Sequence, residues 1–192
     1  MEDNELIRRI QNGQKEYLNE IAAKYYDDIY YFCAYQTGNR EDAYDLAQET
    51  FLRFIRYVDS YRYRNLKGYL LTIAMNLCRT YFHETARKRM GQEYTEEIAG
   101  CAGVDHTKGN APDTVTGNTA GIGRMEQSQV LSEALLKLPA MQREAVVLHH
   151  FYGYKNREIA HMTGASCAAV KSRINQGLDK LKNLLHKEDF YE

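Results

Sequence analysis

A glycine-rich segment over residues 91–123 divides this chain into two blocks. The segment holds seven glycines and Pro112, and Pro139 is the only other proline among the 192 residues. Such a composition buries too little apolar surface to offset the entropy lost on ordering. In both flanking blocks, apolar residues recur every three or four positions, as they do in amphipathic helices. We therefore expect an all-α chain with two small helical domains, residues 10–89 and 126–186, joined by a flexible linker over residues 90–125.

Charge is distributed unevenly along the chain, although the total is close to neutral. The 25 basic and 26 acidic residues give a formal charge of −1, which argues against a protein that binds nucleic acid by charge alone. Residues 62–90, however, contain seven basic residues and one acidic residue. Such a block indicates either a local site for a polyanion or a solvated helix face. The sequence leaves both interpretations open.

Several protein classes are disfavoured by what the sequence lacks. It has no run of about 18 apolar residues, and its start is acidic, so we expect neither a membrane span nor a signal peptide. The four cysteines are widely spaced, which disfavours a zinc knuckle or a disulfide framework and favours a reducing cytoplasm. No glycine-rich phosphate loop, His-Glu-x-x-His or Gly-x-Ser-x-Gly motif occurs, so we predict no metal, no cofactor and no catalytic residue.

The first block predicts helices over residues 14–36, 40–58 and 66–88, with a loop over residues 59–65. Asn39 is placed to cap the second of these helices. Apolar side chains line one face of that helix, whereas Asp45, Gln48 and Glu49 share the opposite, polar face. On the third helix we expect the polar side chains to point outward; these are Lys67, Thr72, Asn76, Arg79 and His83.

The second block predicts helices over residues 126–138, from Pro139 to about 150, over 155–162 and over 167–186. The last two form a helix-turn-helix pattern. Gly164 fits a turn that needs positive φ, and Ser166 is placed to cap the second helix. An apolar stripe leaves a hydrogen-bonding face on that helix, of a kind that reads base edges in a major groove. An ordinary helical hairpin with a polar outer face is the alternative.

These motifs together resemble a known protein family. The segments Leu138–Leu148 (LPAMQREAVVL), Glu158–Ala160 and Val170–Ile174 look like the fourth domain of a bacterial sigma factor. The segments Glu41–Leu52 (EDAYDLAQETFL) and Leu66–Asn76 (LKGYLLTIAMN) are similar to the second domain of that family. Their order, with a linker in place of a third domain, resembles the extracytoplasmic-function (ECF) group. The resemblance implies a subunit that directs core RNA polymerase to promoters and helps to melt them.

The resemblance also implies three binding sites. Core polymerase would be bound by the polar helix face at Asp45, Leu46, Gln48 and Glu49. The minus-ten element would be bound by the basic block through Arg62, Tyr63, Arg64, Lys67, Asn76, Arg79, Arg87, Lys88 and Arg89. The minus-thirty-five element would be bound by the helix-turn-helix through Lys155, Arg157, Ser166, Lys171, Ser172, Arg173, Asn175 and Gln176.

Further expectations concern the promoter, the tyrosines and the linker. Asn175 and Gln176 favour bidentate contacts with adenine, so we hypothesise a promoter element that differs from the commonest one. Tyr61, Tyr63 and Tyr69 offer stacking surfaces for single-stranded bases, but burial in the core is the simpler interpretation for each. The acidic linker fits either mimicry of a nucleic-acid strand or a plain tether.

Partners follow from the same resemblance, and one alternative function stays open. The family resemblance implies core RNA polymerase, promoter DNA and a cognate anti-sigma factor as partners, with no direct membrane insertion of this chain. The alternative is a helix-turn-helix DNA-binding regulator that does not act as a polymerase subunit. Transcription reconstituted with purified core enzyme would distinguish the two.

Overall fold

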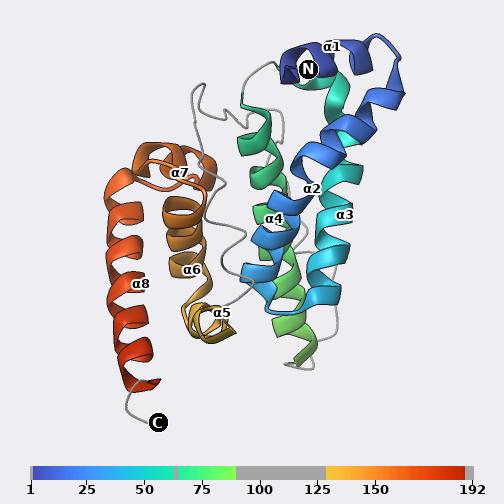
Figure 1. The fold of residues 1–192 in the computed structure, drawn as a ribbon. Helices are drawn as coiled ribbons and strands as arrows, with labels where there is room; N and C mark the ends of the chain where they lie inside the picture. The colour runs from blue at the N-terminus through green and yellow to red at the C-terminus, as the bar shows by residue number, and fades with distance from the viewer. Residues whose placement is uncertain (1, 63–64, 90–128, 189–192) are drawn as a thin grey trace.

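The structure is a computed structural model that describes residues 2–62, 65–89 and 129–188. Within these ranges the chain forms helices and no strand, as the sequence predicts. Two groups of helices lie side by side (Figure 1). We call residues 2–89 the N-terminal bundle and residues 129–188 the C-terminal bundle.

The N-terminal bundle is built around three long helices, α2 (Leu18–Thr37), α3 (Arg40–Tyr57) and α4 (Leu66–Arg89). Short 3₁₀ turns, η1 (Lys15–Tyr17) and η2 (Val58–Ser60), precede α2 and follow α3. The apolar faces of the three helices meet in one core because their apolar residues recur at helical spacing. Its fully buried side chains include Ile21, Ile29, Phe32, Ala43, Ala47, Phe54, Leu70 and Leu71.

A first helix that we did not predict, α1 (Asp3–Gln11), covers one end of this bundle. Its side chains Leu6, Ile7 and Ile10 are buried against the core. The amide of Gln11 donates hydrogen bonds to the backbone oxygens of Val58 and Tyr61 at 2.8 and 3.1 Å. The helix therefore fixes the segment that leads into α4.

The junction between α2 and α3 confirms the predicted cap. Gly38 ends α2 in the left-handed conformation, with φ of 70°. The side-chain oxygen of Asn39 then accepts hydrogen bonds from the backbone N–H groups of Glu41 and Asp42 at 2.8 and 3.3 Å. Because these two N–H groups have no partner within the helix, Asn39 fixes the first turn of α3.

The C-terminal bundle contains α5 (Gln129–Leu136), α6 (Ala140–Val146), α7 (Asn156–Thr163) and α8 (Cys167–Glu188). The helix that we predicted from Pro139 to about 150 changes instead into a π-helical turn, η6 (Val147–Phe151). α6 and α8 approach each other closely at Gly177, where an added Cβ would lie 2.7 Å from a methyl group of Val146. Tyr152 and Tyr154, which follow the π turn, are fully buried.

The two bundles pack directly against each other. The Tyr152 hydroxyl donates to the backbone oxygen of Asp28 in α2 at 2.5 Å, and its ring lies 6.0 Å from that of Phe32. Nearby, the rings of Phe151 and Tyr35 are 5.4 Å apart. This contact also covers the part of α4 that carries Lys67 and Arg79, two residues that we predicted to point outward. The linker predicted over residues 90–125 lies outside the described residues.

Candidate nucleic-acid and polymerase interfaces

The polar face of α3 is accessible, as predicted. Asp45 and Gln48 are exposed, whereas Leu46 and Glu49 are half-buried. A carboxylate oxygen of Glu49 accepts a hydrogen bond from Arg53 at 2.9 Å, one helical turn away. Asp45 and Gln48 therefore remain presented to a partner on the outer side of the N-terminal bundle.

Apolar side chains that we did not single out share this side of α3. Tyr44, Leu52 and Ile55 are 49%, 57% and 41% exposed. Together with Gln48 they recur every three or four residues, so they follow one another along the helix. Large apolar side chains among polar ones are typical of the central part of a protein–protein interface. Their helical spacing is the sequence signal that would have identified them.

The candidate minus-ten residues are not all accessible in the described part of the chain. Arg62 is exposed, and Asn76 and Arg87 are half-buried. Tyr63 and Arg64 lie outside the described residues, and the side chains of Lys88 and Arg89, in the last turn of α4, are not described either.

Lys67 and Arg79 are each paired with a carboxylate within the chain, which differs from the freely outward-facing side chains that we predicted. The Lys67 ammonium lies 2.8 Å from a carboxylate oxygen of Asp28 and 5.3 Å from the centre of the Tyr152 ring, and only 13% of its side chain is exposed. Arg79 donates two hydrogen bonds to the carboxylate of Glu144 in α6, at 2.7 and 3.1 Å. The physical reason is the C-terminal bundle, which covers this part of α4.

The carboxylate of Glu144 is buried, with 7% of its side chain exposed, whereas Arg79 remains 38% exposed. Burial raises the pKa of Glu144, and the charge and hydrogen bonds of Arg79 act in the opposite direction. Desolvation of the Glu144 carboxylate thus outweighs the electrostatic stabilisation that Arg79 provides for its charged form.

Tyr61 and Tyr69 belong to the core. They are 7% and 8% exposed, and their ring centres lie 4.9 Å apart. The ring of Tyr69 also meets Phe54 edge-on at 6.4 Å. Burial raises the pKa of Tyr69. Of the two functions that we considered for these side chains, core packing is the one that the structure confirms.

The helix-turn-helix has the predicted local geometry. Gly164 ends α7 with φ of 66°, in the left-handed conformation. The hydroxyl of Ser166 accepts a hydrogen bond from the backbone N–H of Ala169 at 3.1 Å, so it caps α8. Val170 and Ile174 on the inner face of α8 are buried, which turns its polar face outward.

The outward face of α8 carries the candidate base-reading residues. Lys171, Ser172, Asn175 and Gln176 are all exposed. The amide oxygen of Gln176 accepts a hydrogen bond from Gln142 of α6 at 2.8 Å, and its nitrogen donates to Ser172 at 3.0 Å. Gln176 is therefore already tied to its neighbours, whereas Lys171 and Asn175 remain open to a ligand. Of the candidate phosphate contacts, Lys155 and Arg157 are exposed and Arg173 is half-buried.

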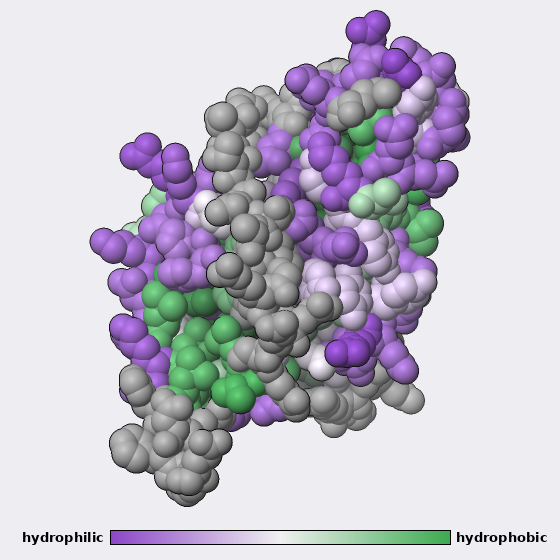
Figure 2. Space-filling model, viewed as in Figure 1, coloured by the Kyte–Doolittle hydropathy of each residue, from purple (hydrophilic) through white to green (hydrophobic). Residues whose placement is uncertain are grey.

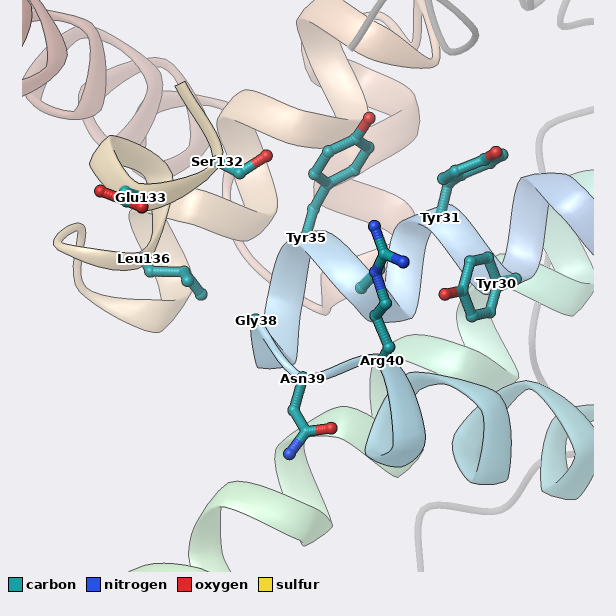
Figure 3. Close-up of a pocket in the computed structure, with 10 residues that line it drawn as sticks. Tyr30, Tyr31, Tyr35, Gly38, Asn39, Arg40, Ser132, Glu133 and Leu136 are labelled. Atoms are coloured by element: carbon teal, nitrogen blue, oxygen red, sulfur yellow. The ribbon is translucent and has the colours of Figure 1, made fainter. Parts of the chain in front are cut away.

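The hollows on the surface of the described residues include two of similar size. The first, of about 500 Å³, lies where α2 and the start of α3 meet α5, and is lined by Tyr31, Tyr35, Arg40 and Leu136 among others. Figure 3 shows the Arg40 side chain rising between Tyr35 and Tyr31, with Ser132 and Leu136 of α5 opposite. The second, of about 520 Å³, is lined by Leu138, Pro139 and Leu184 among others. Figure 2 shows apolar side chains gathered at this lower end of the C-terminal bundle.

The described residues offer no sign of a metal centre or a membrane span. No group of three or more His, Cys, Asp or Glu side chains among them is arranged to hold a metal ion. None of the helices described is both long enough and apolar enough to cross a bilayer.

Each of the two bundles matches a known protein family. Residues 21–88 match the family described as Sigma-70 region 2, and residues 128–181 match Sigma-70, region 4. The chain is 31% identical to the ECF RNA polymerase sigma factor EcfG of Rhodopseudomonas palustris, over 80% of this chain and 78% of that protein. The chain belongs to the ECF RNA polymerase sigma factors. It is also 29% identical to ECF RNA polymerase sigma factor SigW of Bacillus subtilis, over 93% of this chain and 94% of that protein.

Solved structures show the same fold for this ECF sigma factor. The sigma factor RpoE from Bartonella quintana, crystallised with the anti-sigma factor NepR, superposes with a TM-score of 0.66 at 22% identity, over 88% of this chain and 96% of that one. CnrH, in complex with the cytosolic domain of CnrY, gives a TM-score of 0.63 at 22% identity, over 96% and 97% of the two chains. Like its family, the chain directs promoter-specific transcription, which disfavours the alternative of a regulator that acts outside the polymerase.

Proposed function

We propose that this sigma factor uses three separate surfaces, one for core RNA polymerase and two for promoter DNA. The observation that carries the proposal is the exposed outer face of α3, because a regulator that only bound DNA would have no use for it. On that face Asp45 and Gln48 are followed along the helix by the exposed side chains of Leu52 and Ile55. Carboxylate and amide groups around an apolar strip suit a basic helix of the polymerase.

We assign the minus-ten element to α4 and the segment before it. Arg62 is exposed and supplies phosphate attraction, and the amide of Asn76 is suited to hydrogen bonding with the edge of an unstacked base. Lys67, Arg79, Arg87, Lys88 and Arg89 extend the basic strip along α4, and Tyr63 and Arg64 precede it. The domain limits proposed for this unit are residues 10–89, extended at the front by α1.

We assign the minus-thirty-five element to α7 and α8. Lys171 and Asn175 lie on the exposed face of α8 and are the side chains most suited to reading base edges. Lys155 and Arg157 at the start of α7 are placed for phosphates, which position the helix without reading sequence. Gln176 holds the hydroxyl of Ser172 in place through its hydrogen bond. The unit proposed for this role is residues 126–186, and residues 90–125 link it to the first.

A cognate anti-sigma factor is the regulatory partner that we propose. Support comes from the solved structures of RpoE in complex with the anti-sigma factor NepR and of CnrH in complex with the cytosolic domain of CnrY. An anti-sigma factor that covered the outer face of α3 would compete directly with core polymerase. We further propose that the chain acts in the cytoplasm and carries no catalytic chemistry of its own.

Run-off transcription with purified core polymerase on a genomic promoter library tests the assignment. The wild-type chain should restore initiation at a defined set of promoters. Gln48→Ala combined with Leu52→Ala should abolish initiation at every promoter, because it removes core binding. Asn76→Ala should impair promoter opening, and Lys171→Ala should weaken duplex recognition. Normal initiation by all three variants would contradict the site assignment.

A matched control uses a residue outside all three surfaces. Asp179 lies exposed on α8 and is not part of the proposed DNA-reading set. Asp179→Asn removes one surface charge and should leave promoter choice and initiation unchanged. A loss as large as that of Lys171→Ala would mean that α8 responds to any surface change and that base reading is not localised.

A further inference from the structure

Two of the basic side chains that we assign to promoter DNA already have an anionic partner within the chain. Arg79 forms its double hydrogen bond with Glu144, which belongs to the C-terminal bundle. Lys67 is enclosed between the carboxylate of Asp28 and the ring of Tyr152, also from the C-terminal bundle. A guanidinium that donates two parallel hydrogen bonds to one carboxylate cannot hold a phosphate in the same way at the same time.

Glu144 offers Arg79 the same chemistry as a DNA phosphate. Both groups are anionic and present two oxygens to the fork of a guanidinium. The distances of 2.7 and 3.1 Å to the two carboxylate oxygens are those of a bidentate pair. The C-terminal bundle therefore places the Glu144 carboxylate at the position that a phosphate of the minus-ten strand would have to take to bind Arg79.

Aromatic side chains, rather than this ion pair, anchor the contact. Tyr152 is completely buried, with its hydroxyl bonded to Asp28 and its ring against Phe32. Arg143 is also buried there; it donates to the side chain of Gln36 at 3.4 Å and lies 5.4 Å from the centre of the Phe82 ring. Buried aromatic and arginine side chains are the ones that carry most of the binding energy in contacts between proteins.

We propose that the C-terminal bundle is an internal competitor of promoter DNA. It docks on the minus-ten face of α4 through Tyr152 and Glu144, so the free chain has to open before Arg79 can reach a phosphate. This inference rests on the function proposed for α4. The apparent affinity for minus-ten DNA then falls in proportion to the fraction of open molecules.

A charge swap across the interface tests the docking without any DNA. Glu144→Arg places a second cation against Arg79 in a buried site that also faces Arg173, and Arg79→Glu places two carboxylates together. Each single variant should open the chain, which small-angle X-ray scattering reports as a larger radius of gyration. The double variant restores an opposite pair and should return to the wild-type radius.

Controls separate opening from unfolding. Asp179→Arg makes the same change in charge on an exposed position of the C-terminal bundle and should keep the wild-type radius. Circular dichroism should show the same helix content for all variants, because only the contact between the bundles changes. A radius that is identical in all variants would overturn the proposed docking, and so would a double variant that stays as open as the single ones.

Binding of a fluorescein-labelled single-stranded oligonucleotide then tests the competition. Its sequence is the minus-ten strand of a promoter found by run-off transcription. Glu144→Arg should bind it about tenfold more tightly than wild type, as for a chain that is about 90% closed, whereas Asp179→Arg should change affinity far less. An opened Glu144→Arg chain without this gain would overturn the competition. Failure of the wild-type chain to initiate transcription at all would instead refute the proposed function.

Discussion

The hydroxyl of Ser166 accepts a hydrogen bond from the Ala169 N–H at 3.1 Å, and Ser166 also belongs to the proposed minus-thirty-five surface. Ser166→Ala should lower the free energy of unfolding by about 1 kcal/mol, because the cap is lost. Ser166→Asp keeps a capping oxygen and should retain stability, yet its negative charge should weaken binding to a promoter duplex. Urea denaturation and duplex titration measure the two effects. Equal stability of wild type and Ser166→Ala would contradict the capping role.

At the scale of the helices, Gly177 sets the distance between α6 and α8. Alanine is favoured over glycine in a helix by about 1 kcal/mol. Here, however, the added methyl group would lie 2.7 Å from a Val146 methyl group. Overpacking of this kind costs about 1–3 kcal/mol, so Gly177→Ala should destabilise the protein by about 1 kcal/mol in urea denaturation.

The effect of Gly177→Ala on stability should change sign when the side chain of Val146 is shortened. In a Val146→Ala background the crowding methyl group is gone, and Gly177→Ala should then stabilise the protein through its helix propensity. The comparison needs no functional assay, and the single Val146→Ala variant serves as its reference. A stabilising effect in both backgrounds would show that the helices can separate at no cost.

Helical periodicity predicted the elements that are governed by local sequence. Apolar spacing located α3, α4 and α8, and the chemistry of Asn39, Gly164 and Ser166 located two helix starts and the turn. The helix α1 was missed although Leu6, Ile7 and Ile10 form one apolar face, because that face is short. The π turn at Val147–Phe151 has no periodic signature that distinguishes it from the end of α6.

The candidate site was predicted less completely than the fold, for a physical reason. Periodicity says which residues of α4 face the N-terminal core, but not that a second bundle covers part of the remaining surface. Arg79 and Lys67 were therefore expected in solvent and lie instead against Glu144 and Tyr152. On α3, which no second bundle covers at Asp45 or Gln48, the same reasoning predicted the accessible face correctly.

At the scale of the whole molecule, the contact between the bundles should control the reactivity of the thiols. Cys33 and Cys78 are buried in the N-terminal bundle, whereas Cys167 on α8 is exposed. A hydrogen bond with Cys33, together with burial, raises the pKa of Cys78, which lies close enough to Arg143 and Glu144 to respond to their charges. A thiol reagent at pH 7.5 should therefore modify Cys167 at once and Cys78 slowly, because the thiolate is the reactive form.

Opening should remove this protection. In the Glu144→Arg variant the cover provided by α6 is lost, so Cys78 should react several times faster while the rate at Cys167 stays the same, as measured by mass spectrometry of the labelled peptides. Cys167 thus serves as an internal control in every sample. Cys78 reacting as fast as Cys167 in the wild-type chain would mean that the bundles separate freely in solution. If Cys78 reacts slowly in the wild type and faster only in Glu144→Arg, the contact between the bundles controls access both to this thiol and to the DNA-binding face of α4.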